Sequence, residues 1–265
     1  MPIHCPITFR PVPDHEFAAV DKRVMASCFA SQNQLGRLCE ERVYENDVAA
    51  RLRADGFTDL HTQVPIHVSL RSFKKTYRLD FVVDGNVYEF KAADSFVPTN
   101  ETQVIHYAAL LGLDRIKLVN LGGSSVEGRM KRCPFAEWAR QQVTLDRVRW
   151  RPLRKQCEIL AADAEDCLRD WGGFLEAQLY QEALIHFNGG EDACVRRLLV
   201  ARAGFALGHH AVALHAQDIG FVTTALDQTV AYERELKRLL DLLPLRAWQW
   251  INIRHSHMSL VTLTK

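Results

Sequence analysis

The chain has 265 residues, 48% of them apolar and 25% charged, which is typical of a soluble protein with one large domain or two ordinary ones. The net charge of +1 argues against nucleic-acid binding through a broad basic surface. The basic clusters at 71–78 and 147–155 could still contact phosphate. The seven cysteines show no C-x-x-C spacing, which indicates reduced thiols. Because the chain shows neither a signal peptide nor about 18 consecutive apolar residues, we expect a cytoplasmic protein.

The first part of the chain predicts an α/β (α+β) domain over residues 1–132, with a mixed sheet flanked by helices. Apolar residues at helical spacing predict its helices, and alternating apolar and polar residues predict its strands. Asp84-Gly85-Asn86 predicts a tight hairpin turn. The expected elements are helices over 14–31 and 38–54, strands over 62–70, 76–83 and 87–92, a helix over 100–111 and a strand over 115–121.

The composition changes near residues 133–157, where prolines and an arginine run predict a linker. A C-terminal α+β domain is expected over residues 158–265. Its expected elements are a helix over 158–187, strands over 194–201, 210–215 and 219–225, a helix over 231–243 and a strand over 246–253.

The candidate catalytic residues are Asp80, Glu89 and Lys91. Glu89 and Lys91 are two residues apart on one strand, so they share a face. The hairpin at Gly85 brings Asp80 across from Glu89. Two carboxylates and the backbone carbonyl of Phe90 could hold Mg²⁺ or Mn²⁺ with positions left for water and phosphate. The pattern predicts phosphodiester hydrolysis, with the lysine orienting water and stabilising developing charge; the alternative is an exposed strand face with a minor ion pair.

Two helices contribute further candidates. Gln103 and Tyr107 are four residues apart on the helix that follows the site and share a face. They could hold the substrate backbone; alternatively, Gln103 is a solvent residue and Tyr107 a core residue. On the preceding helix, Glu41 and Glu45 share a face, and the alternative is again a solvated surface.

Four runs along the chain resemble the GxxExxY proteins of the PD-(D/E)xK nuclease superfamily, over roughly residues 14–132. The resemblance implies a metal-dependent phosphodiesterase fold with a central mixed sheet and a motif set shared with RecB-type nucleases. The runs are GRLCEERVYE at 36–45, QVPIHV at 63–68, TYRLDFVVDGNVYEFKAAD at 76–94 and ETQVIHYAALLGL at 101–113.

The resemblance also implies roles for individual residues. Asp80 and Glu89 correspond to metal ligands and Lys91 to the catalytic lysine. Gln103 and Tyr107 match the Q-x-x-x-Y element of RecB-type enzymes and imply substrate binding.

The helix motif of the family is less regular in this chain. Glu41 corresponds to the helix glutamate, as a further ligand or base, and Tyr44 to the motif tyrosine. Leu38 stands where the family has glycine. Since Gly36 lies four residues before Glu40, that residue is an alternative to Glu41.

The two halves share an outline that is consistent with an internal duplication, or with helix–strand units that look alike by chance. Residues 107–120 can be laid over residues 239–252 without a gap, and Tyr44-Glu45 and Tyr180-Gln181 lie near the start of each half. If the preceding strands match as well, Asp80 falls opposite about Ala213, Glu89 near Val222 and Lys91 near Thr224, so the second copy keeps no acid–acid–lysine set. We expect such a degenerate copy to pack on the first, as an intramolecular pseudo-dimer or as a substrate-binding surface.

Two functions remain open from the sequence. The first is a metal-dependent nuclease, with DNA as the expected substrate. The second is a non-catalytic module that binds nucleic acid or protein on a nuclease-derived fold. The intact Asp80, Glu89 and Lys91 set favours the nuclease.

Overall fold

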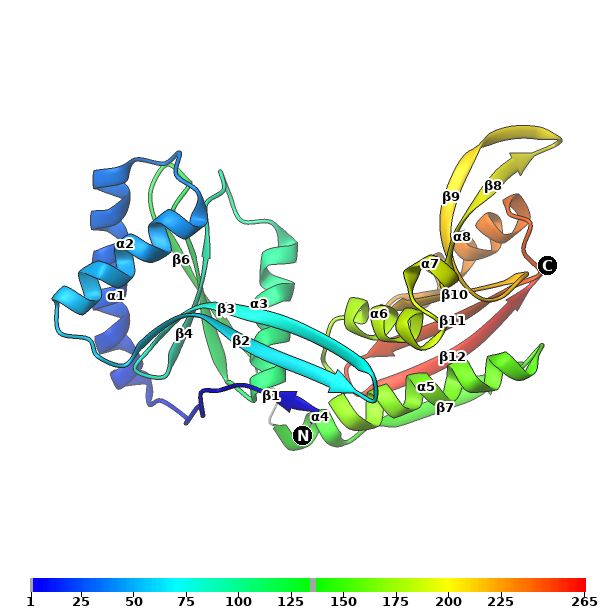
Figure 1. The fold of residues 1–265 in the computed structure, drawn as a ribbon, viewed down its shortest axis with the longest axis horizontal. Helices are drawn as coiled ribbons and strands as arrows, with labels where there is room; N and C mark the ends of the chain where they lie inside the picture. Colours follow the sequence, from blue (N-terminus) through cyan, green and yellow to red (C-terminus); the bar gives the residue numbers. More distant parts are fainter. Residues whose placement is uncertain (1, 134–136) are drawn as a thin grey trace. The chain divides into compact units, whose positions relative to one another are not determined.

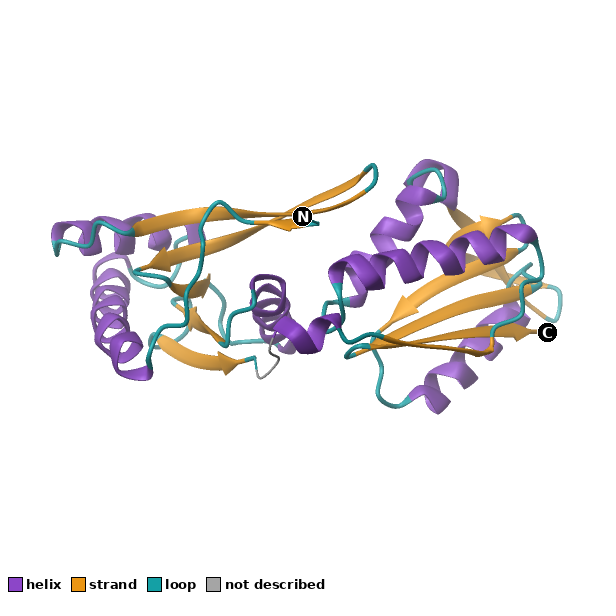
Figure 2. Ribbon diagram, turned by 90° about the horizontal axis from the view of Figure 1, so that it is seen from below, coloured by secondary structure: helices purple, strands orange, loops and turns teal. Residues whose placement is uncertain are grey.

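The structure is a computed structural model that describes residues 2–133 and 137–265. The chain divides into two compact units: unit 1 comprises Met1–Ser69 and Lys74–Glu137, and unit 2 comprises Leu70–Phe73 and Trp138–Lys265. Each unit has one six-stranded mixed sheet flanked by helices (Figures 1 and 2), as the sequence predicted for the fold class. Within the described parts of the chain, no helix has the length and apolar character needed to cross a membrane.

Unit 1 is built on a sheet with the strand order β1-β2-β3-β4-β5-β6. Strands β4 and β5 are parallel and joined through α3, whereas β3 pairs with β4, and β5 with β6, in antiparallel fashion. Buried side chains of α1, α2 and strands β3 to β5 share one core. The elements are α1 (Asp14–Leu35), α2 (Glu41–Ala54), α3 (Pro98–Leu111), β1 (Ile3–His4), β2 (Leu60–Leu70), β3 (Phe73–Val83), β4 (Asn86–Lys91), β5 (Arg115–Asn120) and β6 (Glu127–Arg132).

Unit 2 is built on a sheet with the strand order β7-β12-β11-β10-β9-β8. Strands β10 and β11 are parallel and joined through α8, and β11 pairs antiparallel with β12. The elements are α4 (Glu137–Gln141), α5 (Lys155–Trp171), α6 (Ala177–Phe187), α7 (Glu191–Cys194), α8 (Thr229–Leu242), β7 (Thr144–Arg149), β8 (Val195–Arg202), β9 (Phe205–Ala216), β10 (Ile219–Thr224), β11 (Ala247–Arg254) and β12 (His257–Thr264).

Two expectations for the middle of the chain differ from the structure. The segment expected as a linker, 133–157, contains β7, which pairs in parallel with β12. Five of its six side chains are exposed and three are charged, so the strand lacks the apolar alternation that would predict it. The single helix expected over 158–187 is two helices, because the chain turns at Gly172 and Gly173. A Cβ on Gly173 would lie 2.3 Å from the carbonyl oxygen of His255, so only glycine permits this close approach.

The two units share the order of most of their elements. After a first strand, β1 or β7, each has two helices, three consecutive neighbouring strands, a crossover helix, a parallel strand and an antiparallel strand. Unit 2 also has the short helices α4 and α7, and its first strand pairs with the last one, β12, whereas β1 pairs with β2. In both units a buried tyrosine of the second helix donates its hydroxyl hydrogen to the glycine carbonyl that ends the first helix, Tyr44 to Gly36 and Tyr180 to Gly172.

A buried asparagine lies at the last position of the parallel strand pairing in each unit. The Asn120 side chain binds both the N–H and the carbonyl of Ala93, and the Asn252 side chain binds both groups of Leu226. Each asparagine therefore holds the loop that follows the neighbouring strand.

We predict that Asn120→Ala and Asn252→Ala each lower the free energy of unfolding by about 2–3 kcal/mol, because each leaves backbone groups without partners. Urea denaturation measures this loss, and Asn46→Ala on the exposed surface of α2 is the matched control. A loss below about 0.5 kcal/mol, the size of an ordinary surface substitution, would contradict the structural role of these asparagines.

Candidate active site

A tight hairpin places Asp80 beside Glu89. Asp84 and Gly85 both have positive φ, 45° and 74°, which suits a two-residue turn between right-twisted strands. Strands β3 and β4 pair from the turn as far as Phe81 and Tyr88. Asp80 and Glu89 are the next residues along the two strands, so they lie beside each other. There the Phe90 N–H donates to the Asp80 carboxylate over 2.9 Å. Both acids are buried, as the expected convergence requires.

The ammonium of Lys91 lies among the oxygens that the sequence suggested for a metal. Its Nζ donates to Glu89 Oε1 over 2.9 Å and to the Phe90 carbonyl over 2.7 Å. It also lies 3.8 Å from Asp80 Oδ2 and 3.6 Å from Glu41 Oε2. A positive charge thus occupies the centre of this oxygen cluster.

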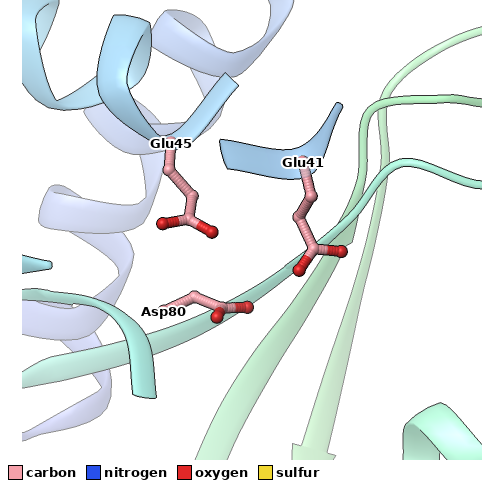
Figure 3. A group of neighbouring side chains, drawn as sticks. All are labelled: Glu41, Glu45 and Asp80. Atoms are coloured by element: carbon pink, nitrogen blue, oxygen red, sulfur yellow. The ribbon is translucent and has the colours of Figure 1, made fainter. Parts of the chain in front are cut away.

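Helix α2 adds two carboxylates to the cluster. One oxygen from each of Glu41, Glu45 and Asp80 lies within 4.8 Å of the others, and Figure 3 shows the three side chains converging. Glu41 and Glu45 reach the same place because they are one helical turn apart. Glu40 is the exposed residue that precedes α2, so the geometry brings Glu41, rather than its neighbour, to the site.

Gln63 is a site residue that the sequence analysis did not identify. Its side-chain amide donates to Glu45 over 3.0 Å and to Asp80 over 3.1 Å, and so braces one acid against the other. Its φ of 54° is uncommon for a residue with a side chain. Glu45 could have been found from its spacing to Glu41. Gln63 is the first residue of the QVPIHV run, to which the sequence analysis assigned no role.

Gln103 and Tyr107 form a pair on α3. The Gln103 amide donates to the Tyr107 hydroxyl over 2.9 Å, and the buried Tyr107 ring packs edge-on against Tyr77 of β3, with 5.8 Å between ring centroids. Gln103 and Tyr107 therefore lie on the same face of α3. Their contact with substrate stays a prediction. Tyr44 is buried and closes the α1–α2 loop, so it supports α2 rather than facing substrate.

The electrostatics of the site favour binding of a further cation. Burial, and then the Asp80 charge, raise the pKa of Glu89 well above its usual value. Burial also raises the pKa of Glu41 and of Glu45. The Glu89 Oε2 atom is buried and has no hydrogen-bond partner in the parts of the chain that the structure describes. This carboxylate-rich set therefore fits a divalent cation, which prefers oxygen ligands.

The family comparison agrees with this geometry. Residues 18–133 match the family model of the PD-(D/E)XK nuclease superfamily. The matched nuclease-superfamily segment contains every acidic and basic residue of the cluster, from Glu41 on α2 to Lys91 on β4. No curated protein and no solved structure matches the chain.

We predict that Mn²⁺ raises the melting temperature of the protein in a saturable manner and that Glu41→Gln removes most of this shift. Binding to the folded state alone stabilises by about 2.7 kcal/mol at 100 times Kd. Thermal denaturation across a Mn²⁺ series measures the shift. Glu40→Gln is the matched control and should respond like the wild type; the reverse pattern would place the helix ligand at Glu40.

We predict that Lys91→Ala binds Mn²⁺ about 10-fold more tightly than the wild type, because it removes a positive charge from the same oxygens. Isothermal titration calorimetry measures both dissociation constants. Exposed Lys22 on α1 supplies the control variant, Lys22→Ala, whose affinity should not change. Weaker binding by Lys91→Ala would mean that the ion binds elsewhere.

Proposed function

We propose that unit 1 is a metal-dependent nuclease that hydrolyses phosphodiester bonds, with DNA as the expected substrate and Mg²⁺ or Mn²⁺ as the ion. The observation that carries this proposal is the Lys91 ammonium, which lies within 4 Å of oxygens from Glu89, Asp80 and Glu41. This set lies in a segment that matches the PD-(D/E)XK nuclease superfamily.

The ion would be held by side chains that already converge. Asp80 and Glu41 would provide ligands, and Glu45 a further carboxylate. Glu89 and the Phe90 carbonyl, which now accept from Lys91, would complete the set. When bound, a divalent cation polarises a phosphate oxygen and makes its bound water more acidic. Among the residues that the structure describes, none offers a hydrogen-bond partner to the buried Oε2 of Glu89, and this observation supports the fit.

The remaining groups have roles that follow from their charge. Burial alone would lower the pKa of Lys91, but Glu89, Asp80 and Glu41 outweigh it and hold that pKa above its usual value. Lys91 is therefore a hydrogen-bond donor at neutral pH, suited to orienting water and stabilising charge on phosphate. Glu41 is more exposed than the other site acids and has a raised pKa, so we assign it proton transfer as well as ligation.

Unit 2 is proposed to be a degenerate copy of unit 1. Thr224 pairs with Asn252 as Lys91 pairs with Asn120, which places Thr224 at the lysine position and Val222 at the Glu89 position. The Ala213–Phe221 pair corresponds to Phe81–Tyr88. It follows that Val212, one residue before the expected Ala213, takes the Asp80 position.

A neutral hydrogen bond replaces the charged cluster in unit 2. Gln181 stands where unit 1 has Glu45, and its side-chain oxygen accepts from the N–H and the hydroxyl of Thr223 over 2.8 and 2.6 Å. Catalysis is therefore assigned to unit 1. The closer resemblance to GxxExxY proteins and the cytoplasmic location also remain predictions.

The test is a cleavage assay on linear and circular DNA, and on RNA, with Mn²⁺ or with EDTA. We predict that Lys91→Ala and Asp80→Ala each lower the cleavage rate by about 10²- to 10³-fold, the effect of removing a charge-stabilising group. Lys22→Ala should retain the wild-type rate. The rate should fall to background in EDTA.

Two outcomes would overturn the proposal. Cleavage that survives both Lys91→Ala and Asp80→Ala would show that the activity arises outside this cluster. Absence of cleavage of DNA and RNA by the metal-loaded wild type would favour the non-catalytic binding module.

A further inference from the structure

The outer part of the β8–β9 hairpin in unit 2 is a two-stranded ribbon, formed by Val195–Val212 (yellow in Figure 1). β9 pairs with β10 only from Ala213 onward, so before that point it pairs with β8 alone. The ribbon ends in a two-residue turn at Ala203 and Gly204, which both have positive φ, 49° and 83°. Because such a turn suits the right-handed twist of its strands, the ribbon stays narrow as far as its tip.

The ribbon has one attached face and one free face. Leu198 and Val200 pack against the apolar core that α8 shares with the sheet. Side chains alternate between the two faces of a strand, and directly paired residues share a face. The free face is therefore formed by exposed residues of both strands, namely Arg197, Leu199, His209 and Ala211.

The ribbon is basic, although the chain as a whole is nearly neutral. It contains three arginines, Arg196, Arg197 and Arg202, and no acidic residue, so its formal charge is +3, whereas the whole chain carries +1. Arg197 and Arg202 are exposed, and no carboxylate among the described residues forms an ion pair with either. Elsewhere in unit 2 the Arg254 guanidinium is held by Asp227. Guanidinium groups without a carboxylate partner are suited to binding phosphate.

Apolar side chains stand beside this charge at the tip of the ribbon. Phe205 is 74% exposed and Leu207 is 55% exposed, and Phe205 pairs with Arg202 across the turn. Exposed apolar side chains of this size indicate a binding surface. Arginine for phosphate and an aromatic ring for the bases are the two kinds of contact that nucleic acids require.

We propose that the β8–β9 ribbon binds double-stranded DNA by entering its major groove, with Arg197 and Arg202 on phosphates and Phe205 against base edges. Neighbouring strands lie about 4.8 Å apart, and the major groove of B-form DNA, about 12 Å wide, admits a two-stranded ribbon. The major groove of duplex RNA is too narrow for side chains to read, so the shape of the ribbon selects DNA. This inference rests on the proposed nuclease function for the choice of nucleic acid as the anionic partner.

Fluorescence anisotropy of labelled duplex DNA tests the inference on the full chain in EDTA, which prevents metal-dependent cleavage. Arg197→Ala combined with Arg202→Ala should raise the dissociation constant about 10-fold or more, because two charged contacts are lost. The slope of log Kd against log salt should fall by about 1.8, since each phosphate contact contributes about 0.9. Arg53→Ala combined with Arg246→Ala removes the same charge from exposed positions outside the ribbon and should bind like the wild type.

Two further measurements separate the contacts with bases and the shape of the groove from charge alone. Phe205→Ala should raise the dissociation constant about 5-fold or more, the effect of losing an aromatic contact with a base, and should leave the salt slope unchanged. Duplex RNA and single-stranded DNA of the same sequence should each bind the wild type about 10-fold more weakly than duplex DNA. Circular dichroism verifies that each variant is folded.

The outcomes that contradict the inference differ from those that contradict the nuclease. A wild type that does not bind duplex DNA in EDTA would overturn the ribbon's role. So would arginine variants that bind like their control, a Phe205→Ala variant of unchanged affinity, or equal affinity for duplex RNA or single-stranded DNA. Ribbon-dependent binding of DNA without cleavage in Mn²⁺ would instead contradict the proposed nuclease function alone.

Discussion

The contact between the Lys91 ammonium and the oxygens of Glu89 and Phe90 is the interaction on which the charge balance of the unit 1 site depends. Four carboxylates, Glu41, Glu45, Asp80 and Glu89, meet in a largely buried place, where like charges repel strongly and burial disfavours ionisation. The lysine offsets part of that charge. Burial, and then the charge of Asp80, raise the pKa of Glu89. This agrees with our proposal that the cluster binds a further cation.

The scaffold around the cluster holds each acid by a different element. The β3–β4 hairpin places Asp80 and Glu89 across one pair of strands. Helix α2, held by the Tyr44 hydroxyl at the carbonyl of Gly36, brings Glu41 and Glu45 from the other side. Gln63 then joins the two sets through Glu45 and Asp80. Packing of α2 against the sheet therefore sets the geometry of the charged centre.

The sequence predicts the part of this site that depends on local geometry. The Asp84-Gly85 turn and the two-residue repeat of a strand are enough to bring Asp80 to Glu89 and to align Lys91. The role of Gln63 could not be predicted, because its contacts depend on its own left-handed backbone conformation within β2 and on the position of α2, which is distant in the sequence. Strand β7 could not be predicted for a similar reason, since its pairing with β12, which is distant in the sequence, makes it a strand.

The second unit keeps the supports of the site without its charges. Asn252 and Tyr180 make the same backbone contacts as Asn120 and Tyr44, whereas Gln181 and Thr223 form a neutral pair. This pattern agrees with our proposal that unit 2 is a degenerate copy of unit 1, in which folding requires the supports and catalysis does not require the acids.

The most direct test of a metal-dependent site in unit 1 is anomalous scattering from crystals grown with Mn²⁺. Our account predicts a peak at the manganese edge bound by Asp80 and Glu89, with Glu41 beside it and the Lys91 ammonium moved away from the Phe90 carbonyl. A map with no peak at these carboxylates, and Lys91 still bonded to Glu89 and Phe90, would contradict it.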